Sequence, residues 1–139
     1  RTEDPIDYPV MGLEALWSVS DGEFDIRRKD NWCWTAMILQ PDPVTAELVE
    51  RVSAETAKKK DLPAASKVRF ETLHEGLSMQ AMHIGSFDSE GPLVELMARM
   101  IQEGGYRAAG KHHEIYLSDF RRTAPEKLRT IIRHPVEKA

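Results

Sequence analysis

The sequence predicts a single α+β domain spanning residues 1–139. Several short segments alternate their side chains with a period of two, which is typical of strands. One segment repeats apolar residues at helical spacing. With 139 residues, 41% of them hydrophobic, the chain has the usual length of one domain and can bury a modest core.

Two strands are predicted near the start of the chain. Residues 11–19 are rich in apolar side chains and lie between Pro9 and the turn signal Asp21-Gly22. Residues 31–40 place Trp32, Trp34, Ala36 and Ile38 on one face and Cys33, Thr35, Met37 and Leu39 on the other. Because both faces are largely apolar, we expect this second strand to be covered on both sides.

A helix and a hairpin are predicted next. Pro41-Asp42-Pro43 ends the second strand, Thr45 offers a hydroxyl cap, and the lysines at 58–60 suit a helix C-terminus. After a connecting loop at 62–66, residues 68–73 and 77–84 flank Glu75-Gly76, a pattern that favours a hairpin.

The second half of the chain contains the clearest helix. Pro92 suits its first turn, Gly104-Gly105 ends it, and its apolar stripe comprises Leu93, Leu96, Met97, Met100 and Ile101. Residues 111–118 and 130–136 predict two more strands, joined by a turn with a capping box of Thr123 and Glu126.

The order of elements predicts a duplicated unit of strand, helix, strand and strand. The second half holds the whole unit, whereas the first half supplies only two strands and a connecting helix. The chain also opens with Arg1 and not Met. We therefore expect further residues upstream of Arg1 in the natural protein.

Composition bears on the binding partners and the location of the protein. The formal net charge of -4, with acids and bases interspersed, argues against direct nucleic acid binding. The single cysteine, Cys33, excludes an intrachain disulfide and favours a cytoplasmic location. No apolar run reaches the length of a membrane span, and the charged start at residues 1–4 is unlike a signal peptide.

A carboxylate and a phenol are the candidate chemical groups. Strand alternation places Glu114 and Tyr116 on one face, opposite Ile115 and Leu117. We expect the apolar pair to pack against the helix stripe, and Glu114 and Tyr116 to face a region rich in Trp and Met. Burial would raise the pKa of Glu114, whereas a hydrogen bond from Tyr116 would lower it.

Purely structural roles are the alternative explanation for these residues. A strand Glu is more often solvated than buried, because charged groups are seldom buried unless paired. Taken singly, the tryptophans and methionines are ordinary core residues, and this holds for Trp17, Trp32, Trp34, Met79 and Met82.

Metal and phosphate chemistry are not indicated. The five histidines and Cys33 form no HExxH motif and no paired cysteine spacing, so no metal site and no cofactor are predicted. His112 and His113 are adjacent on a strand and point to opposite faces. Gly104-Gly105 closes a helix and does not open one, as a phosphate loop would.

Three segments resemble one known family. Residues 112–136, HHEIYLSDFRRTAPEKLRTIIRHPV, closely resemble the C-terminal signature of GyrI-like small-molecule-binding proteins. That signature usually reads Glu-Ile-Tyr-Leu-Ser-Asp-Pro, then Arg, Thr and Ala-Pro-Glu-Lys-Leu; Phe120 stands where the Pro is usual. Residues 34–45 (WTAMILQPDPVT) and 80–90 (QAMHIGSFDSE) are also similar, so the resemblance covers nearly the whole chain.

The resemblance implies a fold and a function. Such proteins pair two strand-helix-strand-strand units, with helices outside antiparallel sheets that enclose a ligand cleft, and they possess a strand and a helix before the position of Tyr8. Related domains serve as drug sensors of transcription activators, in which a buried Glu, matched here by Glu114, meets cationic aromatic compounds. The resemblance therefore implies binding of a hydrophobic or aromatic small molecule, with a homodimer as a possible assembly.

Two alternatives follow from the same resemblance. Some similar proteins hydrolyse the cyclopropane ring of DNA-alkylating antibiotics; here Glu114 would orient or deprotonate water and Tyr116 would donate a hydrogen bond to the substrate carbonyl. Others are protein-interaction modules such as gyrase inhibitors. The candidate catalytic residues are Glu114 and Tyr116, and the candidate ligand-binding residues are Trp17, Trp34, Met79, His83, Glu114 and Tyr116.

Overall fold

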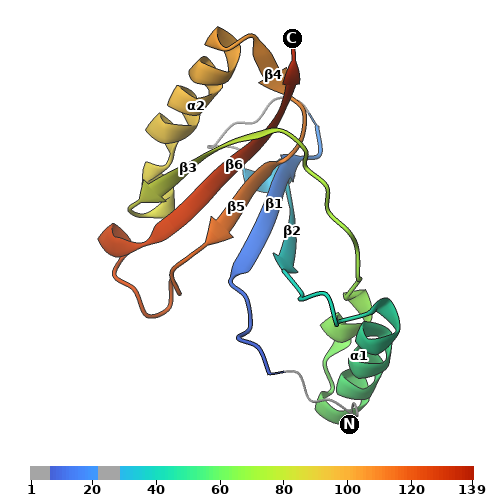
Figure 1. Ribbon diagram of the computed structural model, residues 1–139. Helices are drawn as coiled ribbons and strands as arrows, with labels where there is room; N and C mark the ends of the chain where they lie inside the picture. The colour runs from blue at the N-terminus through green and yellow to red at the C-terminus, as the bar shows by residue number, and fades with distance from the viewer. Residues whose placement is uncertain (1–6, 22–28) are drawn as a thin grey trace. The chain divides into compact units, whose positions relative to one another are not determined.

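The computed structural model describes residues 7–21 and 29–139, which fall into two compact units (Figure 1). The first unit contains residues 40–74 with the segment before Val10, and the second contains the remainder. The charged start at residues 1–4 and Gly22 of the predicted turn lie outside the described residues. Within the described ranges, no helix is both long enough and apolar enough to cross a membrane.

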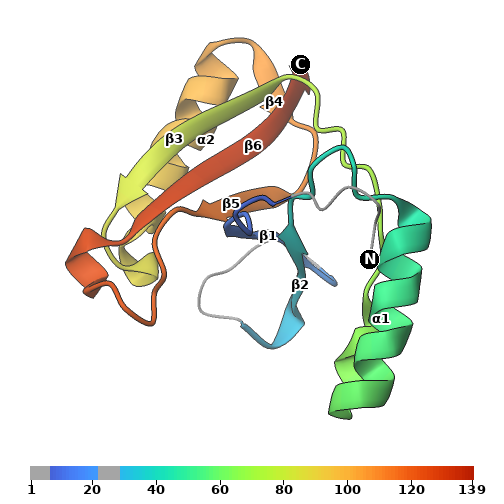
Figure 2. The ribbon, with the colours of Figure 1, turned by 60° about the horizontal axis from the view of Figure 1, so that its bottom comes forward.

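The second unit is built on a six-stranded antiparallel sheet, and the predicted α+β class is confirmed. Its strands are β1 (Leu13–Val19), β2 (Trp32–Ile38), β3 (Ser78–Ile84), β4 (Tyr106–Ala108), β5 (His112–Tyr116) and β6 (Arg129–Lys138). The order across the sheet is β2-β1-β5-β6-β3, with β4 paired to the far end of β6. Figure 2 shows β3, β6 and β5 following one another across the sheet.

The predicted amphipathic helix is confirmed as α2 (Gly91–Glu103). Pro92 lies in its first turn, and the chain leaves the helix through Gly105, whose positive φ of 77° favours glycine. Met97 and Ile101 of the apolar stripe are buried, whereas Met100 is 49% exposed.

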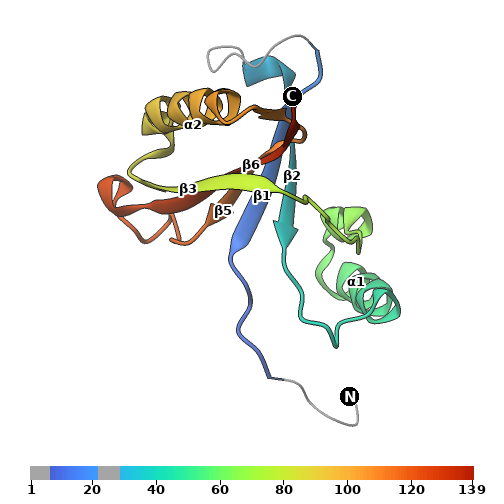
Figure 3. The ribbon, with the colours of Figure 1, turned by 45° about the horizontal axis from the view of Figure 1, so that its top comes forward.

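Figure 3 shows α2 lying over one face of the sheet, and buried residues of the second unit include Met97 and Ile101 of α2 and Ile132 of β6. The register places Ile132 beside Glu114, and Thr130 beside Tyr116 and His83. Directly paired residues project to the same side of a sheet. We call this side the Glu114 face; Ile132 and Thr130 on it are buried.

The opposite face carries a buried ionic cluster around His113, which is only 1% exposed. Nδ1 of His113 lies 3.0 Å from the carboxylate oxygens of Glu75, and Nε2 lies 2.9 Å from Oε2 of Glu14. Arg133 donates a further hydrogen bond of 2.9 Å to Glu75. The cluster therefore links β1, β5 and β6 to the residue that leads into β3.

The prediction that β2 is covered on both sides is wrong. β2 is an edge strand, and neither of its faces is fully covered: Trp34 and Ile38 on one face are 64% and 46% exposed, and Cys33 on the other face is exposed. A strand with two apolar faces is typical of a central strand. The apolar pattern of one strand does not reveal whether other elements of the fold cover its two faces.

The first unit confirms the predicted helix and corrects the predicted hairpin. The helix is α1 (Ala46–Lys60), and the Thr45 hydroxyl accepts a hydrogen bond from the amide of Leu48. Residues 68–73 have no regular structure, so no hairpin forms with β3. A 3-10 turn at Pro63–Lys67 replaces the predicted loop at 62–66. Without a partner strand, an apolar run does not form a sheet ladder.

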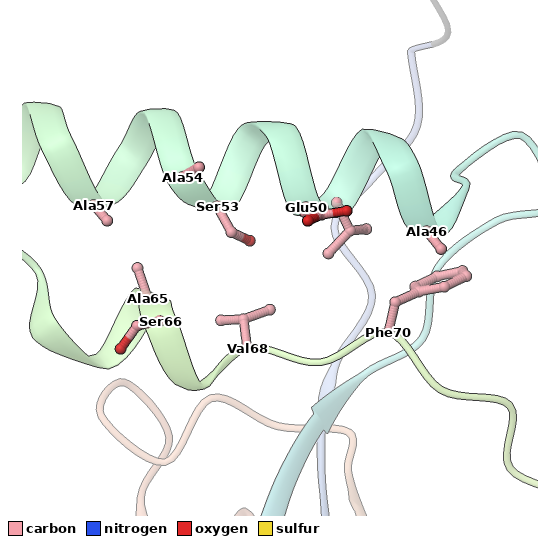
Figure 4. A pocket seen from close by; sticks show the side chains of 10 residues that line it. Ala46, Glu50, Ser53, Ala54, Ala57, Ala65, Ser66, Val68 and Phe70 are labelled. Carbon is pink, nitrogen blue, oxygen red and sulfur yellow. The ribbon is translucent and has the colours of Figure 1, made fainter.

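A hollow of about 420 Å³ lies in the first unit, between α1 and the following segment (Figure 4). Figure 4 shows Val68 and Phe70 facing the helix side that carries Ala46 and Ala57. Glu114 and Tyr116 do not line it.

The predicted capping box of Thr123 and Glu126 does not form. A 3-10 turn at Pro125–Lys127 follows Ala124, and no side chain caps it. The amide of Thr123 instead donates to the carbonyl of Asp119. A turn of three residues is too short to require the cap that a helix needs.

Candidate functional site

Strand β5 presents His112, Glu114 and Tyr116 on the Glu114 face, which confirms the predicted alternation. The prediction that Ile115 and Leu117 pack against α2 is wrong. Leu117 is 46% exposed. The ring of Phe87, just before α2, instead packs edge-on against the ring of Tyr116, with the ring centroids 5.6 Å apart. Alternation decides which side chains share a face, but the side on which a later helix crosses depends on the tertiary fold.

A row of hydrogen bonds leads to the Glu114 carboxylate. The indole Nε1–H of Trp17 donates to the Tyr116 hydroxyl at 3.3 Å, and this hydroxyl donates to Glu114 Oε2 at 2.7 Å. The Glu114 side chain is 13% exposed. Burial and the hydrogen bond to Glu114 raise the pKa of Tyr116, so the phenol stays a neutral donor.

His112 holds the other carboxylate oxygen, and His134 contacts His112 from behind. His112 Nε2 donates to Glu114 Oε1 at 2.9 Å, and His112 Nδ1 lies 2.8 Å from Nε2 of His134. Burial, with a smaller effect of His112, lowers the pKa of His134 to about 4. His134 is therefore neutral near pH 7, and it orients the His112 ring.

Glu114 is ionised at neutral pH although it is largely buried. Burial is the largest single influence and raises its pKa, but the hydrogen bonds from His112 and Tyr116, the electrostatic effect of His112 and a smaller effect of Trp17 together outweigh it. The net result is a pKa below the usual value for Glu. The site thus holds a desolvated negative charge.

Glu90, at the N-terminus of α2, brings a second carboxyl group to Glu114. Glu90 is 7% exposed, and its Oε1 has no hydrogen-bond partner among the described residues. Burial and the adjacent charge of Glu114 raise the pKa of Glu90 to about 8. The two carboxyl groups therefore hold one proton between them near pH 7, because two buried like charges repel.

Glu90→Gln is expected to change how stability depends on pH. Between pH 4.5 and about 8, the folded chain keeps a proton on Glu90 that the unfolded chain has released. Wild-type stability should therefore fall as pH rises through this window, an effect that the variant lacks. Urea unfolding at pH 5 and pH 8 should show the variant gaining stability relative to wild type at the higher pH.

The control for this experiment is Glu95→Gln, an exposed position on the same helix. The free energy of unfolding of this control should differ from that of wild type by the same amount at pH 5 and at pH 8. If Glu90→Gln also differed from wild type by the same amount at both pH values, the protonated state assigned to Glu90 would be contradicted.

The other predicted ligand-binding residues also lie on the Glu114 face. The register pairs Trp34 with Trp17, Met79 with His134, and His83 with Thr130. His83 Nε2 lies 3.0 Å from both the Ser86 carbonyl and the Ser89 hydroxyl, so its ring holds the loop before α2. The ligand-binding roles of all six residues stay predictions.

Sequence reasoning missed Glu90, His112 and His134 as members of the site. His112 had a detectable signal, because it lies two residues before Glu114 on the same strand and therefore on the same face. His134 and Glu90 are distant in sequence, and only the pairing of β5 with β6 and the placement of α2 bring them to Glu114.

Known structures resemble this chain closely. An uncharacterized conserved protein from Listeria innocua is 41% identical, with a TM-score of 0.86 over 99% of this chain and 69% of its own. A hydrolase from Listeria innocua is 36% identical, with a TM-score of 0.82 over 99% and 68%. Another hydrolase from that organism is 38% identical, with a TM-score of 0.84 over the same shares.

No curated protein matches the chain. The family model described as the GyrI-like small molecule binding domain matches residues 9–137. This match includes residues of both units and of every strand that the structure describes. The chain belongs to the family of GyrI-like small molecule binding domains.

Proposed function

We propose that the chain binds hydrophobic or cationic aromatic small molecules on the Glu114 face. The observation that carries this proposal is the ionised, largely buried Glu114, held by Tyr116 and His112. A desolvated carboxylate attracts a cation more strongly than a solvated one, because the local dielectric is low. Family membership supports small-molecule binding in general.

Aromatic side chains on the same face suit a flat ligand. Trp17 lies next to Tyr116, and Trp34, which is 64% exposed, lies beside Trp17 on the neighbouring strand. An exposed indole offers a stacking surface and interacts favourably with a cation. In this proposal the tryptophans select flat rings and Glu114 selects positive charge.

Glu114→Gln is expected to weaken binding of proflavine, a planar aromatic cation, by about tenfold or more. This corresponds to the loss of one charge-assisted contact. Binding of acridone, a neutral molecule of similar shape, should change little. Both affinities can be measured by fluorescence titration of wild type and variant.

Glu126→Gln is the matched control, since Glu126 is exposed and lies outside the Glu114 network. It should leave both affinities unchanged. If Glu114→Gln bound proflavine as tightly as wild type does, the anchoring role of Glu114 would be refuted.

A second candidate function is hydrolysis at the same site, specifically the opening of a cyclopropane ring by water. A protonated Glu90 beside an ionised Glu114 provides one acid and one base at neutral pH. Two of the similar structures are described as hydrolases. Glu114 would orient or deprotonate the water, and Tyr116 would donate a hydrogen bond where negative charge develops.

Incubation with a cyclopropane-bearing alkylating compound separates the two functions. Mass spectrometry should detect a product heavier by one water if the chain is a hydrolase, and Glu114→Gln should abolish that product. If the protein binds the compound and the compound is recovered intact, the result supports binding without hydrolysis.

A further inference from the structure

Three metal-ligating side chains converge on the Glu114 face. Glu90, His112 and Glu114 each offer one ligand atom, and these atoms all lie within 4.8 Å of one another. The three residues come from the N-terminus of α2 and from two positions of β5. Atoms at such separations need only small adjustments to bind one ion, since metal–ligand distances in proteins are about 2.0–2.2 Å.

A buried carboxylate oxygen is the second, independent observation. Glu90 is 7% exposed, yet its Oε1 has no hydrogen-bond partner among the described residues. A buried polar atom without a partner costs about 1–3 kcal/mol and calls for an explanation such as an ion. A cation held between Glu90 and Glu114 would give this oxygen a partner.

The surroundings of His112 also match a metal ligand. Its Nε2 faces Glu114 Oε1 at 2.9 Å, and its Nδ1 lies 2.8 Å from Nε2 of His134. Metal-binding histidines almost always donate their second ring N–H to a neighbouring acceptor, which sets the tautomer and the ring orientation. The His134 imidazole would be that acceptor here.

We propose that Glu90, His112 and Glu114 bind one divalent transition-metal ion, with His134 orienting His112. One imidazole with two carboxylates suits Zn²⁺ or Mn²⁺ better than Mg²⁺ or Ca²⁺, which prefer oxygen ligands alone. Three protein ligands leave coordination positions for water or a bound molecule. Glu114 would bind the ion through Oε1 and keep Oε2 for the Tyr116 hydroxyl.

Calorimetric titration of the chelator-treated chain with ZnCl₂ alone, at pH 7.5, tests the proposal. Wild type should bind one Zn²⁺ per chain, and MgCl₂ should not compete at equal concentration. Glu90→Gln and His112→Asn should each weaken Zn²⁺ binding by at least about tenfold, because each variant removes a ligand. Zn²⁺ should also raise the Tm of wild type and raise that of the variants less.

The matched controls are Glu95→Gln, exposed on the same helix, and His74→Asn, an exposed histidine. Both should bind Zn²⁺ as wild type does, and circular dichroism verifies that every variant is folded. The absence of Zn²⁺ binding by wild type, or unchanged binding by either Glu90→Gln or His112→Asn, overturns the proposal. No organic ligand is used, so failure here leaves the proflavine experiment as a separate test of the proposed function.

Discussion

His113→Leu is expected to lower the free energy of unfolding of the second unit by about 3 kcal/mol. His113 is 1% exposed and contacts the carboxylates of Glu14 and Glu75, which are themselves 19% and 12% exposed. Leucine fills a similar volume but donates no hydrogen bond. Two largely buried carboxylates would then lose their common partner, and Arg133 would be the one remaining cation that contacts Glu75 among residues 7–21 and 29–139.

Urea unfolding followed by tryptophan fluorescence measures this effect. The chain has three tryptophans, at positions 17, 32 and 34, and all lie in the second unit. The signal therefore reports on the unit that contains His113. His74→Leu, the same substitution at an exposed position, should change the midpoint little. A loss below about 0.5 kcal/mol for His113→Leu would mean that the cluster is no stronger than a surface ion pair.

Ile132→Ala is the other substitution with a large expected effect, a loss of about 3–4 kcal/mol. Ile132 is 0% exposed and lies in β6 between Glu114 of β5 and Ala81 of β3. Removing its outer carbons would leave a cavity beneath α2, and the small Ala81 cannot fill it. The same urea measurement detects the loss.

A series at Ile132 distinguishes packing from other causes. Ile132→Val removes one carbon and should cost about 1 kcal/mol. Ile84→Ala, at a position 64% exposed on β3, should cost much less than Ile132→Ala. Equal losses for Ile132→Ala and Ile84→Ala would contradict the placement of the core on the Glu114 face.

Local patterns were sufficient where one element alone decides the structure. The stripe containing Met97 and Ile101 predicted α2, and Thr45 predicted the start of α1, because helix hydrogen bonds and caps are made within a short segment. Residues 68–73 were predicted as a strand and have no regular structure, since a strand also requires a partner elsewhere in the chain.

By itself, the sequence determined that Glu114 and Tyr116 share one side of β5, because side chains alternate along any strand. Only the tertiary structure decided that this side faces α2, where Glu90 comes close to the Glu114 carboxylate and His134 contacts His112. The physical reason is the difference between local and long-range interactions. Backbone geometry sets the direction of each side chain locally. The meeting of residues from β5, β6 and α2 depends on strand pairing and helix placement, to which the whole second unit contributes.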